Sequence, residues 1–289
     1  PSRRPSRSRG RRSRPQRDRR RWPCPTRKTP EFPARCCGGP TTSFAPPNNC
    51  KTFGSGFTGG ASYLLHAKHS HALDVDGRGR VECALTLGAQ LNFVINKNVL
   101  IPRPDTELIV ENVLNLTKQK NKINILDIGV GSGCIIVSIL KERENFRATG
   151  IDLSKKCLII CKKNAIAHKV SSRLKLYKSD VDKFNLGKYD LIVSNPPYIK
   201  KHTLKYLDKG VAKFEPKIAL DGGLDGLSEI RKVVSKSSEL VKTHGKLILE
   251  IAHDQKNEVK KILKSNNFYI NKVVKDFAYN DRCIISTKI

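Results

Sequence analysis

A glycine-rich turn after the apolar run "INILDI" holds the first residues whose types and spacing could do chemistry. Gly129, Gly131 and Gly133 fall in "LDIGVGSG", where glycine lets the backbone turn sharply and approach a ligand closely. The helix expected next would present its N-terminal N–H groups at the same place. The spacing is G-x-G-x-G, with Cys134 at the sixth position, so it departs from the dinucleotide-binding pattern. Asp127, just before the turn, would repel a pyrophosphate but could meet a cationic amino-acid group directly or through water.

Two more aspartates end the next two strand-like runs. Asp152 ends "ATGID" and Asp180 ends "LKLYKSD". An ionised carboxylate at the first position can accept from two ribose hydroxyls, and one at the second can accept from an adenine amino group. Each aspartate alone is more often a helix cap or a loop residue. Because all three fall at successive strand ends, where open α/β sheets bind ligands, they predict a site for an adenosine-containing cofactor.

The stretch "NPPY", Asn195 to Tyr198, directly follows the apolar run "YDLIVS". Asn-Pro commonly opens turns, because proline fixes its own φ and holds the preceding residue extended. A stiff turn at the end of a strand would therefore explain the motif by itself. The alternative is a binding turn, because this strand end would lie beside the glycine-rich turn at the ligand edge of the sheet.

The elements that must position these residues alternate in type along the chain. Strand-like runs are "INILDI", "ATGID", "LKLYKSD", "YDLIVS" and "KLILEIA", and helical patterns such as "SKKCLIICKKNAIA" and "GLSEIRKVVSKSSELVKT" fall between most of them. Apolar strands separated by amphipathic helices predict an α/β fold with a parallel sheet and helices on both faces. "FYINKVVKDF" and "RCIISTKI" are separated only by a short turn, which predicts an antiparallel hairpin at one sheet edge.

The segment before the first of these strands also has a regular pattern. "NFVINKNVLI" alternates like a strand or hairpin, and "PRPDTELIVENVLNLTKQ" predicts a helix whose N-cap is Asp105 or Thr106. The helix would place four apolar residues on one face: Leu108, Ile109, Val113 and Leu116. We place a domain boundary near residue 92, with a disordered Arg/Pro/Gly-rich head at 1–60, a linker or remnant N-terminal segment at 61–91, and one domain at 92–289.

The combination of "LDIGVGSG", "GIDLS" and "VSNPPY" resembles the Rossmann-like seven-strand methyltransferases that use S-adenosylmethionine and methylate a planar nitrogen. "NKNVLIPRPDTELIVE", "EPKIALDGGLDGL" and "DFAYNDRCI" narrow the resemblance, over about residues 92–289, to release factor glutamine methyltransferases. These enzymes methylate the side-chain amide nitrogen of the glutamine in the GGQ motif of peptide chain release factors. The resemblance implies the strand order 3-2-1-4-5-7-6, an S-adenosylmethionine cofactor and no metal.

The resemblance also implies residue roles. Asn195, Pro196, Pro197 and Tyr198 would hold the target glutamine, with the Asn195 side-chain oxygen and a backbone carbonyl accepting from its amide group. Asn195, Pro196 and Tyr198 would serve catalysis. Arg103 and Glu107 would either shape the substrate groove or form a salt bridge at the helix N-terminus. The cofactor would contact Asp127, Gly129, Val130, Gly131, Ser132, Gly133, Asp152, Asp180, Val181 and Asn195.

Other functions share parts of these motifs. Methyltransferases that act on a ribosomal-protein glutamine share NPPY, as do DNA and RNA adenine methyltransferases, and a non-enzymatic RNA-binding protein with a relic methyltransferase fold is a third alternative. Residues 1–91 do not resemble the small helical domain with which the family grips its release factor. The resemblance therefore predicts an intact methyl-transfer site and leaves protein-substrate affinity open.

The composition of the chain bears on its possible partners and on its location. The formal net charge is +29, and Arg prevails in residues 1–90 (15 Arg, 3 Lys) whereas Lys prevails afterwards (6 Arg, 31 Lys). The head is too poor in apolar residues to fold by itself, but its charge would permit non-specific contact with RNA or the ribosome. We expect a cytoplasmic protein without a membrane span, an organellar location being the less favoured alternative.

Cysteine and histidine spacing argues against a structural metal. The nine Cys include no CxxC pair, which disfavours a disulfide framework and a zinc site. His66, His69 and His71 could touch a metal, but a polar linker is the preferred interpretation.

Overall fold

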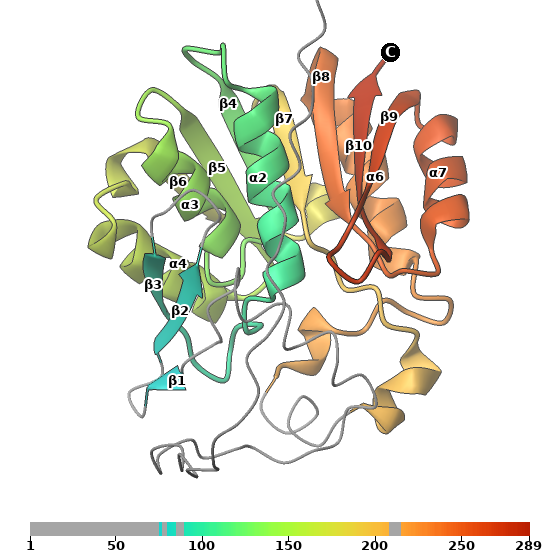
Figure 1. Cartoon of the computed structure of the whole chain (residues 1–289), viewed down its shortest axis with the longest axis horizontal. Helices are drawn as coiled ribbons and strands as arrows, with labels where there is room; N and C mark the ends of the chain where they lie inside the picture. Colours follow the sequence, from blue (N-terminus) through green and yellow to red (C-terminus); the bar gives the residue numbers. More distant parts are fainter. Residues whose placement is uncertain (1–74, 77–79, 85–89, 208–214) are drawn as a thin grey trace, which may run out of the picture. The chain divides into compact units, whose positions relative to one another are not determined.

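The computed structural model describes residues 75–76, 80–84, 90–207 and 215–289, and it contains a seven-stranded sheet in the order β6-β5-β4-β7-β8-β10-β9 (Figure 1). In this sheet β4 to β8 pair in parallel, and β10 pairs antiparallel with β8 and with β9. This confirms the predicted strand order and the C-terminal hairpin. The strands are β4 (Asn124–Ile128), β5 (Arg147–Asp152), β6 (Leu174–Lys178), β7 (Tyr189–Ser194), β8 (Val241–Glu250), β9 (Phe268–Lys275) and β10 (Asp281–Lys288).

Helices cover both faces of this sheet, because successive residues of each strand point to opposite sides. In β4, Ile125 packs in one apolar core and Leu126 in the other. The first core contains α2 (Glu107–Leu116), α3 (Cys134–Glu142) and α4 (Lys155–Ala167). The second contains α6 (Ser228–Leu240) and α7 (Lys256–Ser265). The sheet with helices on both faces therefore agrees with the prediction made from the continuous apolar strands.

The first helix begins as predicted and buries three of the four apolar residues expected on its inner face. A 3-10 turn, η1 (Pro104–Thr106), leads into α2, and Thr106 occupies the N-cap position. Leu108, Ile109 and Val113 are buried as expected, whereas Leu116 is 38% exposed. Val110 and Leu114 are buried instead. The buried stripe follows the middle of the helix, and Leu116, in the last turn, lies at the edge of that stripe.

A second, small antiparallel sheet precedes α2 in the chain. Its strands are β1 (Val75–Asp76), β2 (Arg80–Ala84) and β3 (Gln90–Val94), in that order. Of the strand or hairpin predicted for 92–101, the structure forms a strand in the first residues only, because β3 ends at Val94 and a turn closed by the Asn96 carbonyl and the Val99 N–H follows. β1 and β2 fall within the segment predicted to be a linker or remnant. The predicted disordered head at 1–60 and the three histidines of "HAKHSH" lie outside the described residues.

No helix among the described residues is long and apolar enough to cross a membrane.

Candidate active site

The glycine-rich turn joins β4 to α3 in a conformation that glycine favours. Gly129, Gly131 and Gly133 have φ values of 78°, 54° and 83°. A Cβ at Gly133 would lie 2.7 Å from Cys161 Sγ, whereas one at Gly129 would meet no atom within 4 Å. Gly133 thus permits the packing of the turn against α4, and the surface at Gly129 is open for a ligand.

Asn164 of α4 holds this turn from behind. The side chain is fully buried, and its Nδ2 donates to the Ser132 carbonyl (2.8 Å). Its Oδ1 accepts from the Val94 N–H (2.8 Å), and Nδ2 also donates to the Val94 carbonyl (3.0 Å). One amide therefore joins the small sheet to the turn, which satisfies buried backbone groups and limits the motion of the loop.

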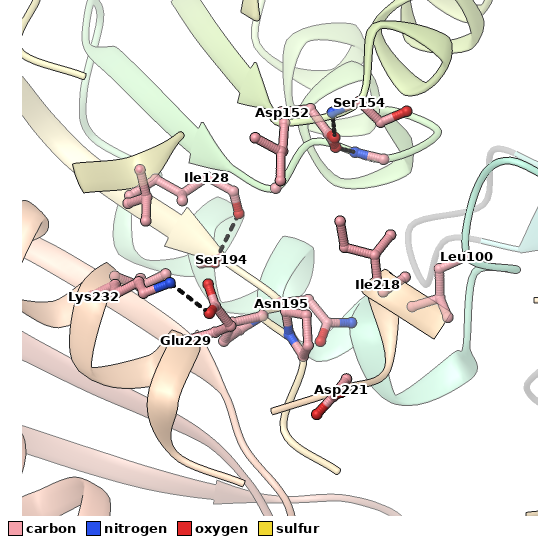
Figure 2. Close-up of a pocket in the computed structure, with 18 of the residues that line it drawn as sticks. Leu100, Ile128, Asp152, Ser154, Ser194, Asn195, Ile218, Asp221, Glu229 and Lys232 are labelled. Atoms are coloured by element: carbon pink, nitrogen blue, oxygen red, sulfur yellow. Dashed lines mark hydrogen bonds and ion pairs between the residues drawn. The ribbon is translucent and has the colours of Figure 1, made fainter. Parts of the chain in front are cut away.

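A cavity of about 790 Å³ lies over the carboxyl ends of β4, β5 and β7 (Figure 2). Gly129 and Gly131 form one part of its wall, and Asp152 lies across the cavity from Asn195. Such a position at the ends of parallel strands is where α/β sheets bind ligands. The structure thus brings the glycine turn, the predicted adenosine-binding aspartates and the NPPY turn to one cavity.

Asp152 is oriented by the backbone around it. Its Oδ2 accepts from the Gly131 N–H (3.0 Å) and its Oδ1 accepts from the Ser154 N–H (2.8 Å). Burial raises its pKa, and these two backbone hydrogen bonds oppose that shift. Each carboxylate oxygen has further acceptor capacity, so the side chain can still bind two vicinal hydroxyls.

Asp180 and Val181 form the next part of the wall. Asp180 follows β6 and caps η3 (Val181–Lys183), accepting from the Asp182 N–H at 3.3 Å. Val181 is buried and, like Asp180, lines the cavity. Nearby, Lys232 of α6 donates to Glu229 (2.8 Å), and both of these residues also line the cavity.

Asp127 lies beneath the glycine turn, 1% exposed, and neither of its carboxylate oxygens has a hydrogen-bond partner among the described residues. Burial raises its pKa to about 8, and the charge of Asp152 adds to the shift. A buried carboxylate without a partner is costly unless a ligand supplies one. Asp127 is therefore suited to meet a cationic group, directly or through a water molecule.

Replacement of Asp127 by Asn is expected to stabilise the ligand-free protein. The pKa of Asp127 is about 8 in the folded chain, against 3.8 for an unperturbed aspartate, so the stabilisation by the bound proton is complete below pH 4 and is lost as pH rises to 8. The melting temperature of Asp127→Asn should therefore exceed that of the wild type by more at pH 8 than at pH 5. Glu144→Gln, at an exposed carboxylate, serves as the control. An equal difference at both pH values would contradict the assignment.

Asn195 follows β7 directly and is fixed from the side away from the cavity. Asn195 lines the cavity, and its Nδ2 donates to the Thr106 Oγ1 (3.0 Å), so the carboxamide oxygen is the end left to accept a hydrogen bond. Ser194 Oγ donates to the Ile128 carbonyl (2.7 Å) and holds the end of β7 against that of β4. The end of β7 thus places Asn195 in the cavity wall beside the glycine turn.

The rest of the NPPY turn divides between the cavity and the core. Pro196 and Pro197 line the cavity, whereas Tyr198 packs against the second apolar core. The Tyr198 hydroxyl donates to Glu250 Oε1 (3.2 Å), so it does not reach the cavity wall. The expectation that Tyr198 contacts the substrate thus stays a prediction, and its role in supporting the turn rests on these contacts.

The segment "EPKIALDGGLDG" pairs with the chain that follows NPPY. The Gly222 N–H donates to the Ile199 carbonyl (2.8 Å), and the Lys201 N–H donates to the Gly223 carbonyl (2.8 Å). A Cβ at Gly222 would lie 2.8 Å from the Tyr198 backbone, so glycine is required for this close approach. Two motifs that are separate in sequence therefore form one wall.

Arg103 anchors the same wall. Its guanidinium contacts Glu215 (2.5 Å), which lies just before the lining residues Pro216 to Ala219. The salt bridge expected for Arg103 is therefore made to this segment and not within the helix N-terminus. Glu107 does not line the cavity, and burial raises its pKa to about 7.

Sequence patterns missed several polar residues behind the turn. Thr106, Glu250 and Gln255 are buried, and Gln255 donates to the carbonyls of Tyr198 and Gly226 (3.0 Å each). A charged residue at the end of the apolar run "KLILE" was the available signal for Glu250. Of the residues assigned to the cofactor, Asp127, Val130, Ser132 and Gly133 lie in or beneath the turn and do not line the cavity. In the described part of the chain, no cluster of three or more His, Cys, Asp or Glu could hold a metal ion.

Comparisons with known proteins agree with this arrangement. The methyltransferase small domain family matches residues 104–212. A release factor glutamine methyltransferase of Caulobacter vibrioides is 36% identical over 195 residues, which cover 67% of this chain and 68% of the relative. One of Fusobacterium nucleatum subsp. nucleatum is 40% identical over 199 residues, covering 68% of this chain but only 56% of the relative.

A solved structure, the ribosomal protein L11 methylase of Lactobacillus delbrueckii subsp. bulgaricus, superposes with a TM-score of 0.50 at 16% identity. The superposition covers 66% of this chain and 82% of that protein, and it shows a shared fold. The sequence match to the Caulobacter enzyme extends over two thirds of both chains. On these grounds the chain belongs to the release factor glutamine methyltransferase family.

Proposed function

We propose that this protein transfers a methyl group from S-adenosylmethionine to the side-chain amide nitrogen of the GGQ glutamine in a peptide chain release factor. The observation that carries the proposal is the Asn195 side chain, which lines the cavity beside the glycine turn and whose Nδ2 donates to Thr106, so that its carboxamide oxygen is left to accept a hydrogen bond. Family membership supplies the substrate class, since the relatives are named for release factor glutamine methylation.

The residues present fit S-adenosylmethionine. Asp152, Asp180 and Val181 line the cavity, and in this proposal Asp152 accepts from the ribose hydroxyls while Asp180 and Val181 meet the adenine. Gly129 leaves room for close approach of the ligand, and the unpartnered Asp127 carboxylate suits the cationic amino-acid part. When bound, the cofactor supplies an electrophilic methyl group, which the amide nitrogen accepts with loss of one proton.

An amide nitrogen is a poor nucleophile because its lone pair is delocalised into the carbonyl group. The Asn195 oxygen and a backbone carbonyl of the turn can each accept one N–H of the substrate amide. Two acceptors would orient the nitrogen and favour the positive charge that develops on it. Pro196 and Pro197 restrict the backbone that carries these acceptors, so little reorganisation accompanies the reaction.

The cavity mouth is suited to a peptide. Ile218 and Leu224 line it and are 60% and 83% exposed, while Lys201 and Lys217 add positive charge. Contact of the Arg-rich head with RNA or the ribosome stays a prediction, because that segment lies outside the described residues.

The test is incubation of the full chain with S-adenosylmethionine labelled in the methyl group and with separate pools of release factor, ribosomes and adenine-bearing DNA or RNA. Label in the release factor alone is expected. Label in ribosomal protein would favour the ribosomal-protein glutamine alternative. Label in adenine and not in protein would overturn the proposal in favour of a nucleic-acid methyltransferase, which the net charge of +29 would suit.

A further inference from the structure

β3 lies at the edge of the small sheet as far as the chain is described, so the side that it turns away from β2 needs other hydrogen-bond partners. Helix α4 supplies them with two side chains. His168, at the C-cap of the helix, donates from Nε2 to the Asn92 carbonyl (2.8 Å). Asn164, one turn earlier, accepts from the Val94 N–H at Oδ1 (2.8 Å) and donates from Nδ2 to the Val94 carbonyl (3.0 Å). Side chains of α4 thus take the place of a neighbouring strand.

The Asn164 carboxamide also holds the glycine turn. The side chain is fully buried, and Nδ2 donates its second N–H to the carbonyl of Ser132, which lies between Gly131 and Gly133 (2.8 Å). A Cβ at Gly133 would come within 2.7 Å of the Cys161 Sγ of α4, so the turn packs directly on this helix. Both N–H bonds of one amide are therefore used, one for β3 and one for the turn.

The same face of α4 also reaches the cavity. The Cys157 thiol donates to the Asn98 carbonyl (3.2 Å), and both residues line the cavity. Cys157, Asn164 and His168 fall about two turns and one turn apart, a spacing that places them on one side of a helix. The chain from residue 92 to residue 98 therefore follows this side of α4 from its C-terminal end to its N-terminal end, where the cavity lies.

We propose that Asn164 is a positioning residue that couples the order of β3 to the affinity of the glycine turn for S-adenosylmethionine. The inference rests on the proposed contact of the cofactor with this turn, and it does not depend on which substrate receives the methyl group. Coupling between two sites is reciprocal. A change that releases the turn from Asn164 therefore lowers cofactor affinity, and bound cofactor restricts the opening of β3.

Asn164→Asp separates the two ends of the amide with little change in volume. The aspartate keeps an oxygen that can accept from the Val94 N–H. An ionised carboxylate has no N–H to donate, so the carbonyls of Val94 and Ser132 each lose a donor and face a negative charge instead. A protonated carboxyl has a single O–H for the two carbonyls. In either form the turn and β3 are no longer held together by one side chain.

Isothermal titration calorimetry on the full chain tests the effect on the cofactor. The Kd for S-adenosylmethionine should rise on the order of tenfold in Asn164→Asp, because hydrogen bonds that fix the turn are lost. The rate of methyl transfer at saturating cofactor should stay close to that of the wild type, because the NPPY turn is unchanged. Wild-type affinity in Asn164→Asp would overturn the proposal.

His168→Ala separates positioning from folding. It removes the neighbouring hydrogen bond to β3 and the contact of the His168 ring with Phe93 (5.1 Å between ring centroids), so it should lower the melting temperature. Its Kd should match that of the wild type, because the His168 side chain bonds to β3 and not to the turn. An equal rise of Kd in His168→Ala and Asn164→Asp would attribute the loss of affinity to stability alone and would overturn the proposal.

Hydrogen exchange on the wild type tests the reverse direction without a variant. The acceptor of the Val94 N–H is Asn164 Oδ1, so the exchange rate of this amide reports directly on the contact between β3 and α4. Saturating S-adenosylmethionine should slow this exchange. The Asn266 N–H, which donates to the Leu263 carbonyl at the end of α7 (3.1 Å), should exchange at an unchanged rate and serves as the reference. An unchanged rate at Val94 would overturn the proposal even if Asn164→Asp fails to fold.

Failure of the proposed cofactor site is a separate outcome, because Asp152→Ala would then bind S-adenosylmethionine as tightly as the wild type. Weak binding by Asp152→Ala together with wild-type affinity in Asn164→Asp would leave the cofactor site in place and overturn only the coupling. Methylation of a substrate other than release factor would overturn the proposed function and would change neither the Kd values nor the exchange rates.

Discussion

Asn195→Ala is expected to lower the rate constant for methyl transfer on the order of 10²–10³-fold, with the protein still folded. The substitution removes the carboxamide of a residue that lines the cavity and whose Nδ2 donates to Thr106. One of the two interactions that orient the substrate amide is then lost. Single-turnover measurements with saturating enzyme and cofactor would report this step without a contribution from product release.

Three related variants sharpen that result. Asn195→Asp keeps one oxygen acceptor but brings a negative charge to the turn, so it should also impair transfer. Tyr198→Phe should have a smaller effect, because the ring remains packed in the core and only the hydrogen bond to Glu250 is lost. Asn257→Ala, on the exposed side of α7, is the matched control. A rate for Asn195→Ala equal to that of this control would refute the role of Asn195.

Asp152→Ala is expected to weaken S-adenosylmethionine binding by about 1–3 kcal/mol, the range for loss of hydrogen bonds to a charged acceptor. This corresponds to roughly a 5- to 150-fold rise in Kd. The carboxylate is fixed by the N–H groups of Gly131 and Ser154, so it is set in place before the ligand arrives. Isothermal titration calorimetry measures the effect.

The control for this experiment is Asp182→Ala, which removes an exposed carboxylate two residues beyond Asp180. It should leave the affinity unchanged, because Asp182 does not line the cavity. If Asp152→Ala binds the cofactor as tightly as the wild type, the assignment of Asp152 to the ribose is wrong.

Patterns local to each strand, together with the strand order that the resemblance implied, predicted most of the fold and several residues of the cavity wall. β4, β5 and β7 are runs of buried apolar residues with a functional residue at the carboxyl end, and parallel pairing brings those ends together. Because β5, β4 and β7 are neighbours in the predicted order, Asp152 and Asn195 were expected to share a cavity with the glycine turn.

Boundaries were less predictable where local and tertiary preferences differ. The helical pattern through "SSELVKT" continues past Leu240, but Val241 is buried and pairs with Tyr189, so the chain enters β8 there. Burial of a β-branched residue beside β7 thus outweighs the helical pattern.

The support of the NPPY turn could not be predicted, because its partners are distant in sequence. Thr106 is 89 residues from Asn195, and Glu250 is 52 residues from Tyr198. Threonine at an N-cap and glutamate at a strand end have common structural explanations, so only their positions in space reveal the connection to the turn.

The most direct measurement of the central claim is tandem mass spectrometry of a release factor after reaction with this protein and S-adenosylmethionine. The account predicts one methyl group, of about 14 Da, on the side-chain nitrogen of the GGQ glutamine. It also predicts none on a release factor in which that Gln is changed to Glu, because an ionised carboxylate has no N–H group to offer the acceptors of the turn. Methyl transfer to the Glu variant, or to another site while the GGQ glutamine stays unmodified, would contradict it.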